Sequence, residues 1–132
     1  MINPDKEILF QAGGVEFEFQ EWPFIAEAAK ALFETGYDGH CIEIDWTNAA
    51  ASWLWGVPIS LTVLTPDDFL KIGFTQPAAN ARGAGRMVAY FIKKLVEHGA
   101  KTERITMSGM SLGGEMSSYV GKSWNVIKVL LL

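Results

Sequence analysis

The strongest structural signal in the chain is the segment Ile105-Thr106-Met107-Ser108-Gly109-Met110-Ser111-Leu112-Gly113. Its first residues alternate apolar and polar side chains, which is typical of a strand, and the apolar residues that follow it recur at helical spacing up to Gly121. Between strand and helix lies a Gly-x-Ser-x-Gly pentapeptide, from Gly109 to Gly113. We therefore predict a sharp strand-to-helix turn with Ser111 at its apex.

Such a turn suits a catalytic nucleophile. It holds the serine in a strained backbone conformation and leaves no room for a Cβ two residues before and two after it, where this chain has Gly109 and Gly113. It would lift the Ser111 hydroxyl above the C-terminal edge of a sheet and aim the Leu112 N–H at the oxyanion that forms during attack on a carbonyl. The alternative interpretation is a Gly-rich turn that simply packs tightly.

The loop after the first expected strand fits the same mechanism. The apolar run Ile8-Leu9-Phe10 ends before Gly13-Gly14, and these glycines permit close backbone approach. We expect this loop to supply a second oxyanion-hole donor from Gly13 or Gly14. Because two separate loops would serve one mechanism, we favour a nucleophile at Ser111 over tight packing alone.

The other segments alternate between helix and strand patterns. Residues 22–33 have helical spacing, and a second helix is predicted to begin near Pro77 and to run through an apolar stripe up to Val96. Residues 41–46 and 126–132 have strand patterns. This alternation predicts an α/β fold, a mostly parallel sheet with helices on both faces.

The pattern does not explain the connection between Thr47 and Gln76, which is long for a compact domain. It contains the apolar triplet Trp53-Leu54-Trp55, a strand-like run from Ile59 to Leu64, and the turn or helix-start signal Thr65-Pro66-Asp67-Asp68. We treat residues 54–75 as an atypical insertion.

Composition describes one soluble globular domain. The chain has 132 residues, 49% of them hydrophobic, and a formal charge of -4 without a cluster of basic residues, which argues against a nucleic-acid partner. Its single cysteine cannot form an internal disulfide. No apolar run reaches the roughly 18 residues of a transmembrane helix, and the first residues are acidic where a secretory signal peptide would be basic.

These motifs together resemble the pancreatic-lipase-like family of secreted lipases and phospholipases A1. The resemblance lies in residues 41–46, a hydrophobic strand ending in Asp-Trp, in the Asn-x-Arg-x-x-Gly helix start within residues 76–85, and in the Ser-Leu-Gly elbow of residues 105–114. It implies an α/β-hydrolase fold, an acyl-enzyme mechanism on Ser111, a lipid ester or lipid surface as partner, and an extracellular location. It implies no metal and no cofactor.

The acid and base of a catalytic triad are missing from the expected place. In this fold they follow the serine, yet only 21 residues follow Ser111, and they contain no histidine and no acidic residue except Glu115. We expect His40 and His98 at the opposite edge of the sheet, and Asp45 and Trp46 to end a strand and pack under a loop. The chain, residues 1–132, is therefore interpreted as an incomplete lipase-like domain, truncated after the elbow and inactive by itself.

Two other functions remain open. A noncatalytic lipid-binding or yolk-protein-like member of the same fold would use Trp53-Leu54-Trp55 to contact lipid, unless these tryptophans pack in the core. An incomplete or irregular gene product would have no function of its own. The unusual segment 54–75 and the abrupt end at 124–132 fit that third interpretation.

Overall fold

The computed structural model describes residues 2–14, 23–51, 65–124 and 128–131. The triplet Trp53-Leu54-Trp55 and the run from Ile59 to Leu64 lie outside these ranges. In chain order the elements are β1 (Ile8–Ala12), α1 (Pro23–Glu34), β2 (His40–Ile44), α2 (Thr47–Ala50), α3 (Pro66–Glu97), the short 3₁₀ helix η2 (Thr102–Arg104), β3 (Ile105–Gly109), α4 (Leu112–Ser123) and β4 (Lys128–Leu131).

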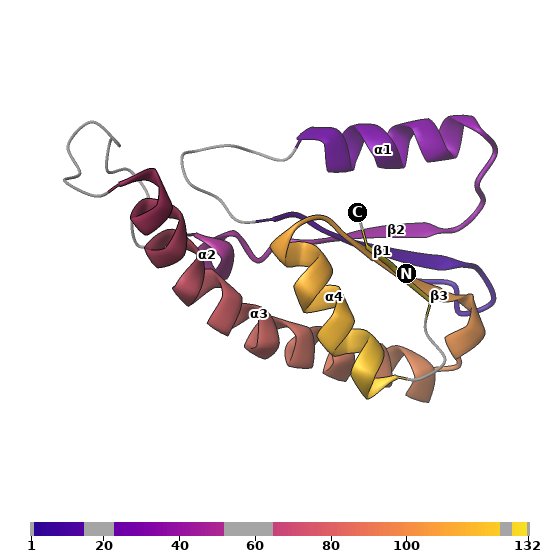
Figure 1. Ribbon diagram of the computed structural model, residues 1–132. Helices are drawn as coiled ribbons and strands as arrows, with labels where there is room; N and C mark the ends of the chain where they lie inside the picture. Colours follow the sequence, from indigo (N-terminus) through magenta and orange to yellow (C-terminus); the bar gives the residue numbers. More distant parts are fainter. Residues whose placement is uncertain (1, 15–22, 52–64, 125–127, 132) are drawn as a thin grey trace.

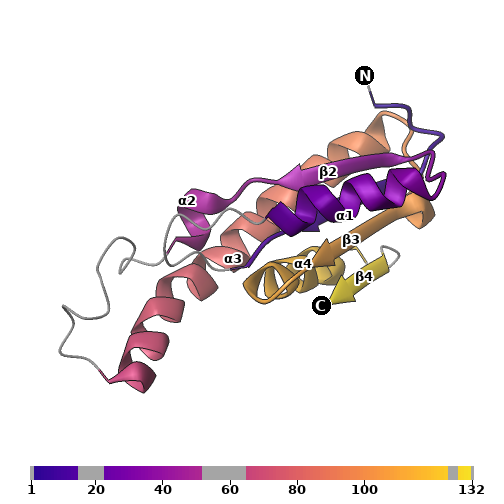
Figure 2. The ribbon, with the colours of Figure 1, turned by 90° about the horizontal axis from the view of Figure 1, so that it is seen from above.

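Within the described residues the strands form one parallel sheet in the order β2-β1-β3-β4. In the register, Ala12 lies between Ile44 and Gly109, so the C-terminal ends of β1, β2 and β3 meet at one edge. Figures 1 and 2 show α1 on one side of the sheet, and Figure 1 shows α3 and α4 together on the other. This arrangement confirms the mixed α/β class with a parallel sheet.

The core lies between the sheet and the pair of helices α3 and α4. Phe10 of β1 and Met107 of β3 are fully buried there, against Ile92 of α3 and Met116 of α4. The opposite face is less covered, because residues of β1 that alternate with the buried ones are only half-buried. Glu43 of β2 is exposed, which agrees with this open face.

The start of the long helix differs from the sequence prediction. α3 begins at Pro66, and Pro77, which we expected to open the helix, lies buried within it. Thr65 is the N-cap, and its hydroxyl accepts the Asp68 N–H at 3.2 Å, so the helix-start signal at residues 65–68 is confirmed. Proline fits the first turn of a helix, but it also occurs inside helices that bend. Figure 1 shows that α3, which contains Pro77, is curved.

The helices α3 and α4 approach each other closely at Gly85. A Cβ on this residue would lie 2.9 Å from the Met116 carbonyl oxygen and 2.9 Å from the Tyr119 Cβ. Two residues earlier on the same helix, Gly83 is exposed and a Cβ there would meet nothing within 4 Å. The absence of a side chain at Gly85 therefore sets the distance between the two helices.

This difference predicts opposite effects for the same substitution. Gly83→Ala should raise the free energy of unfolding by about 0.5–1 kcal/mol, because alanine is the better helix former and has space. Gly85→Ala should lower it by about 1–3 kcal/mol, because the backbone of α4 must shift. Urea unfolding followed by circular dichroism measures both, and a stabilised Gly85→Ala variant would contradict the close helix contact.

Candidate active site

Ser111 stands at the turn between β3 and α4, as the pentapeptide predicts. Its backbone has φ 53° and ψ -125°, and it is the only residue other than glycine with a positive φ in the described part of the chain. Its side chain is exposed at the C-terminal edge of the sheet, just beyond an inner strand. Such a conformation is strained for a residue with a Cβ, and strain of this kind is concentrated at functional sites.

The two glycines of the pentapeptide are required by the packing around Ser111. A Cβ on Gly109 would overlap the Gly113 carbonyl and crowd the Ser117 hydroxyl, which donates to that carbonyl at 2.7 Å. A Cβ on Gly113 would overlap the carbonyl oxygens of Gly13 and Ala12. The structure therefore brings Gly109, Gly113 and the loop after β1 into one tightly packed backbone cluster.

Two backbone segments flank the exposed serine, the start of α4 and the loop after β1. Leu112 is the first residue of α4, so its N–H has no acceptor within the helix and lies at the positive end of the helix dipole. Gly13 and Gly14 are buried in the loop after β1. The Met110 N–H donates to the Ala12 carbonyl at 3.1 Å, which fixes this loop beside the turn. The geometry thus juxtaposes the two segments expected to form an oxyanion hole.

Trp46, two residues beyond the end of β2, also belongs to this cluster. It is 8% exposed, and its indole N–H donates to the Gly13 carbonyl oxygen at 3.0 Å. We expected Trp46 to pack under a loop, but the sequence reasoning did not find this hydrogen bond. One sequence feature could have indicated this hydrogen bond. A tryptophan, whose indole N–H is a single donor, follows closely on a strand that ends at the same sheet edge as the Gly13 loop.

The two histidines lie at the opposite edge of the sheet from Ser111. His40 is the first residue of β2, and its Nε2 accepts the Asn3 N–H at 2.9 Å. His98 follows α3, and its Nδ1 donates to the Lys94 carbonyl at 2.7 Å. A five-residue strand spans roughly 15 Å, whereas a general base must come within about 3 Å of the hydroxyl. Neither histidine can therefore act on Ser111.

Two acidic residues, Asp45 and Glu115, lie near the sheet edge that carries Ser111, and each is hydrogen-bonded to another residue. Asp45 is exposed, and hydrogen bonds from the Thr47 side chain and backbone N–H hold its pKa below the ordinary value. Glu115 is exposed in the first turn of α4, where its carboxylate accepts the Tyr119 hydroxyl at 3.4 Å. Among the described residues, Ser111 thus has the start of α4 and the loop after β1 beside it but no histidine to take its proton.

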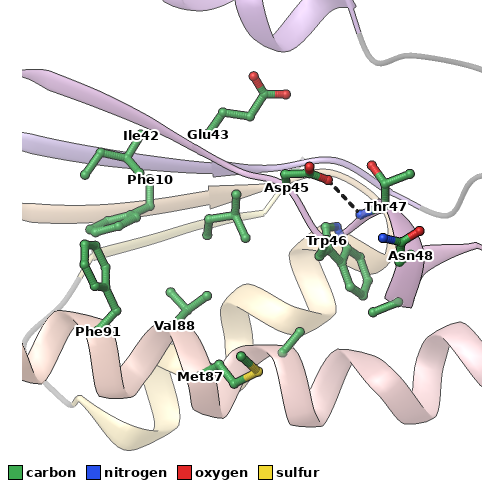
Figure 3. A pocket seen from close by; sticks show the side chains of 13 residues that line it. Phe10, Ile42, Glu43, Asp45, Trp46, Thr47, Asn48, Met87, Val88 and Phe91 are labelled. Carbon is green, nitrogen blue, oxygen red and sulfur yellow. Dashed lines mark hydrogen bonds between the residues drawn. The ribbon is translucent and has the colours of Figure 1, made fainter.

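A separate pocket of about 490 Å³ lies between β2 and α3 (Figure 3). The rings of Phe10 and Phe91 meet edge to face, with centroids 6.1 Å apart. Asp45 and Thr47, joined by their hydrogen bond, lie at its upper rim, while the Glu43 carboxylate points away from it. The lining residues are Phe10, Ile42, Glu43, Ile44, Asp45, Trp46, Thr47, Asn48, Ala49, Ala84, Met87, Val88 and Phe91. Ser111 is not one of them.

The backbone strain at Ser111 predicts an increase in stability on substitution. Ser111→Gly should raise the free energy of unfolding by about 1 kcal/mol, because glycine adopts this conformation without strain. Ser118→Gly, in the middle of α4, should lower it by about 0.5–1 kcal/mol as an ordinary helix substitution. Chemical denaturation measures both variants. Equal destabilisation by the two glycines would mean that Ser111 is not strained.

Comparisons with known proteins do not assign the chain to a family. No protein-family model matches the chain, and no curated protein matches it. Among the described helices, none combines the length and the apolar character needed to cross a bilayer, in agreement with the lack of a long apolar run in the sequence.

Proposed function

We propose that this chain is the nucleophile-bearing core of a serine carboxylic ester hydrolase of the lipase or phospholipase type, on an α/β-hydrolase fold. The observation that carries the proposal is the backbone of Ser111, at φ 53° and ψ -125° between an inner strand and a helix. A serine held in this way presents its hydroxyl outside the sheet edge, where an ester carbonyl can reach it. An extracellular location belongs to the same proposal and rests on the family resemblance alone.

The surrounding groups support the first chemical step. Attack of the Ser111 Oγ on an ester carbonyl would produce a tetrahedral intermediate with a negatively charged oxygen. The Leu112 N–H, at the free end of α4, and an N–H of the loop at Gly13 and Gly14 would stabilise that charge. The nearby backbone dipoles are fixed by the packing of Gly113, so they need no reorganisation during the reaction.

Proton transfer limits this chemistry. The Ser111 proton must leave during attack, and no histidine in the described residues faces it. Without a base, the Ser111 hydroxyl keeps its proton and is a weak nucleophile toward an ester. We therefore expect very low ester turnover from the 132-residue chain.

Phosphonylation tests the nucleophile without a complete triad. We expect an alkyl fluorophosphonate, applied at mildly alkaline pH where hydroxide replaces the base, to modify Ser111 about 100-fold faster than other serines, because each oxyanion donor contributes about 10²–10³ in rate. Ser118 and Ser123 of α4 are internal controls. Peptide mass spectrometry gives the label on each serine. Equal labelling of all three would refute the proposed nucleophile.

The hydrolysis of p-nitrophenyl butyrate provides the control for the missing base. Turnover by the unaltered chain and by Ser111→Ala should both stay close to the rate in buffer. Robust hydrolysis that disappears in Ser111→Ala would instead show that the chain contains a base, and would overturn the expectation of inactivity while supporting the nucleophile.

The pocket between β2 and α3 supports noncatalytic lipid binding as a second candidate function. Its walls are mostly apolar, and Met87 and Phe91 of α3 are 75% and 44% exposed beside it. An apolar pocket with a few polar groups at its rim is typical of sites for small apolar ligands. The Asp45 carboxylate at that rim favours a neutral over an anionic ligand. The alternative contact through Trp53-Leu54-Trp55 falls outside the described residues.

Filling the pocket tests this candidate. Ala84→Leu should weaken binding of the neutral fluorescent probe N-phenyl-1-naphthylamine about tenfold. The leucine side chain would occupy part of the pocket, so the probe would lose apolar contact equivalent to about two methylene groups, or about 1.6 kcal/mol. Ala79→Leu is the matched control, since Ala79 is exposed on the same helix and does not line the pocket. Fluorescence titration measures both. If the two variants bind the probe equally well, the pocket is not its site.

A further inference from the structure

We propose that Trp46 is a positioning residue for the oxyanion hole: its indole N–H fixes the orientation of the Gly13–Gly14 peptide. The proposal rests on the proposed function of Ser111 and extends it to a residue that does not touch the substrate. The observation is the buried hydrogen bond from Trp46 Nε1 to the Gly13 carbonyl oxygen, 3.0 Å long, between residues 33 positions apart in the chain.

The Gly13–Gly14 peptide needs an external restraint. Neither residue has a Cβ, so the torsion angles of the two residues themselves do little to fix the orientation of the peptide plane between them. The carbonyl and the N–H of a trans peptide point in opposite directions, and the described residues contain no cis peptide bond. Holding the Gly13 carbonyl toward Trp46 therefore turns the Gly14 N–H away from Trp46. If the plane rotated, the Gly13 carbonyl would take the place of the Gly14 N–H on the side away from Trp46, and an acceptor would replace a donor there.

The same carbonyl also contacts the nucleophile turn. The Gly13 oxygen lies directly against the Cα of Gly113, at the start of α4, in a space that a Cβ would fill. The Met110 N–H donates to the preceding carbonyl, that of Ala12, at 3.1 Å. The Gly13 carbonyl is thus held between the indole of Trp46 and the turn that carries Ser111. Trp46 consequently determines the position of the loop relative to the nucleophile.

The Trp46 backbone is itself anchored. Its carbonyl accepts the N–H groups of Ala49 and Ala50 at 2.7 and 2.8 Å, which makes it the first acceptor of α2. The Asn80 side-chain amide donates to the Ala49 carbonyl at 2.9 Å and so ties α2 to α3. The short helix α2 and Asn80, the first residue of the Asn-x-Arg-x-x-Gly motif, therefore share a role. Both keep Trp46 in place, and Trp46 in turn keeps the Gly13–Gly14 loop in place.

Trp124 provides a matched control within the same chain. Its indole N–H also donates to a backbone carbonyl, that of Ala89 in α3, at 3.2 Å. The acceptor belongs to a helix and not to the Gly13–Gly14 loop. Phenylalanine at either position removes one indole donor and keeps an aromatic ring, so the two variants differ in which carbonyl loses its partner.

The experiment compares Trp46→Phe with Trp124→Phe in the full chain. The rate of Ser111 phosphonylation by the fluorophosphonate should fall at least tenfold in Trp46→Phe and stay within twofold in Trp124→Phe, because only the former loosens an oxyanion donor. In parallel, the Gly14 amide, assigned in ¹⁵N-glycine spectra with Gly14→Ala, should shift and exchange its hydrogen faster in Trp46→Phe only. Circular dichroism confirms that the variants are folded.

Each outcome is decisive. A folded Trp46→Phe variant with unchanged Ser111 rate and unchanged Gly14 amide overturns the positioning role. If Ser111 is not selectively modified even in the unaltered chain, the proposed function fails, and the Gly14 amide alone decides whether Trp46 holds the loop. If Trp46→Phe does not fold, Asn80→Ala replaces it, with Arg86→Ala, at an exposed position of the same helix, as the control. An unchanged Gly14 amide in Asn80→Ala would then overturn the proposal.

Discussion

The loop after β1 and the start of α4 meet backbone to backbone, and the conformation of the turn at Ser111 follows from that contact. Gly113 lies against the carbonyl oxygens of Ala12 and Gly13, and Gly109 lies against Gly113. Neither contact leaves room for a side chain. Because β1 and β3 are neighbouring parallel strands in register from Ile8 and Ile105 onward, both loops leave the sheet at the same level. The approach of two backbones then follows from the register, provided that glycine occupies these positions.

The sequence predicted this region well because its determinants are local. A serine flanked by glycines at fixed spacing, between a strand pattern and a helix pattern, leaves few alternatives for the backbone. The helix start near Pro77 was predicted wrongly for a different reason. Proline satisfies the first turn of a helix without cost, and here Thr65 and Pro66 provide that start eleven residues earlier. Whether a later proline opens a helix or bends one depends on packing around it, and Pro77 is buried.

The bond from Trp46 to Gly13 was beyond sequence reasoning for a related reason. The two residues come from different strand ends, and only the sheet order β2-β1-β3 brings them together. Similarly, the strand patterns did not reveal how far β2 would remain uncovered, or that Met87 and Phe91 of α3 would be exposed beside it. Those properties depend on which elements pack against α3. The apolar stripe of a helix shows which side chains favour burial but not which of them obtain a partner.

Backbone strain helps to decide between the two candidate functions. Holding Ser111 at a positive φ costs stability, of the order of 1–3 kcal/mol for such conformations, and the pocket between β2 and α3 does not use it, since Ser111 is not among its lining residues. A protein that only bound lipid in that pocket could use Trp46, which lines it, but would gain nothing from the strained turn. The strain and the two close glycine contacts both concern the turn that carries one serine. That concentration favours the hydrolase core over the binding protein, and it makes the source of a base for Ser111 the chemical question on which activity depends.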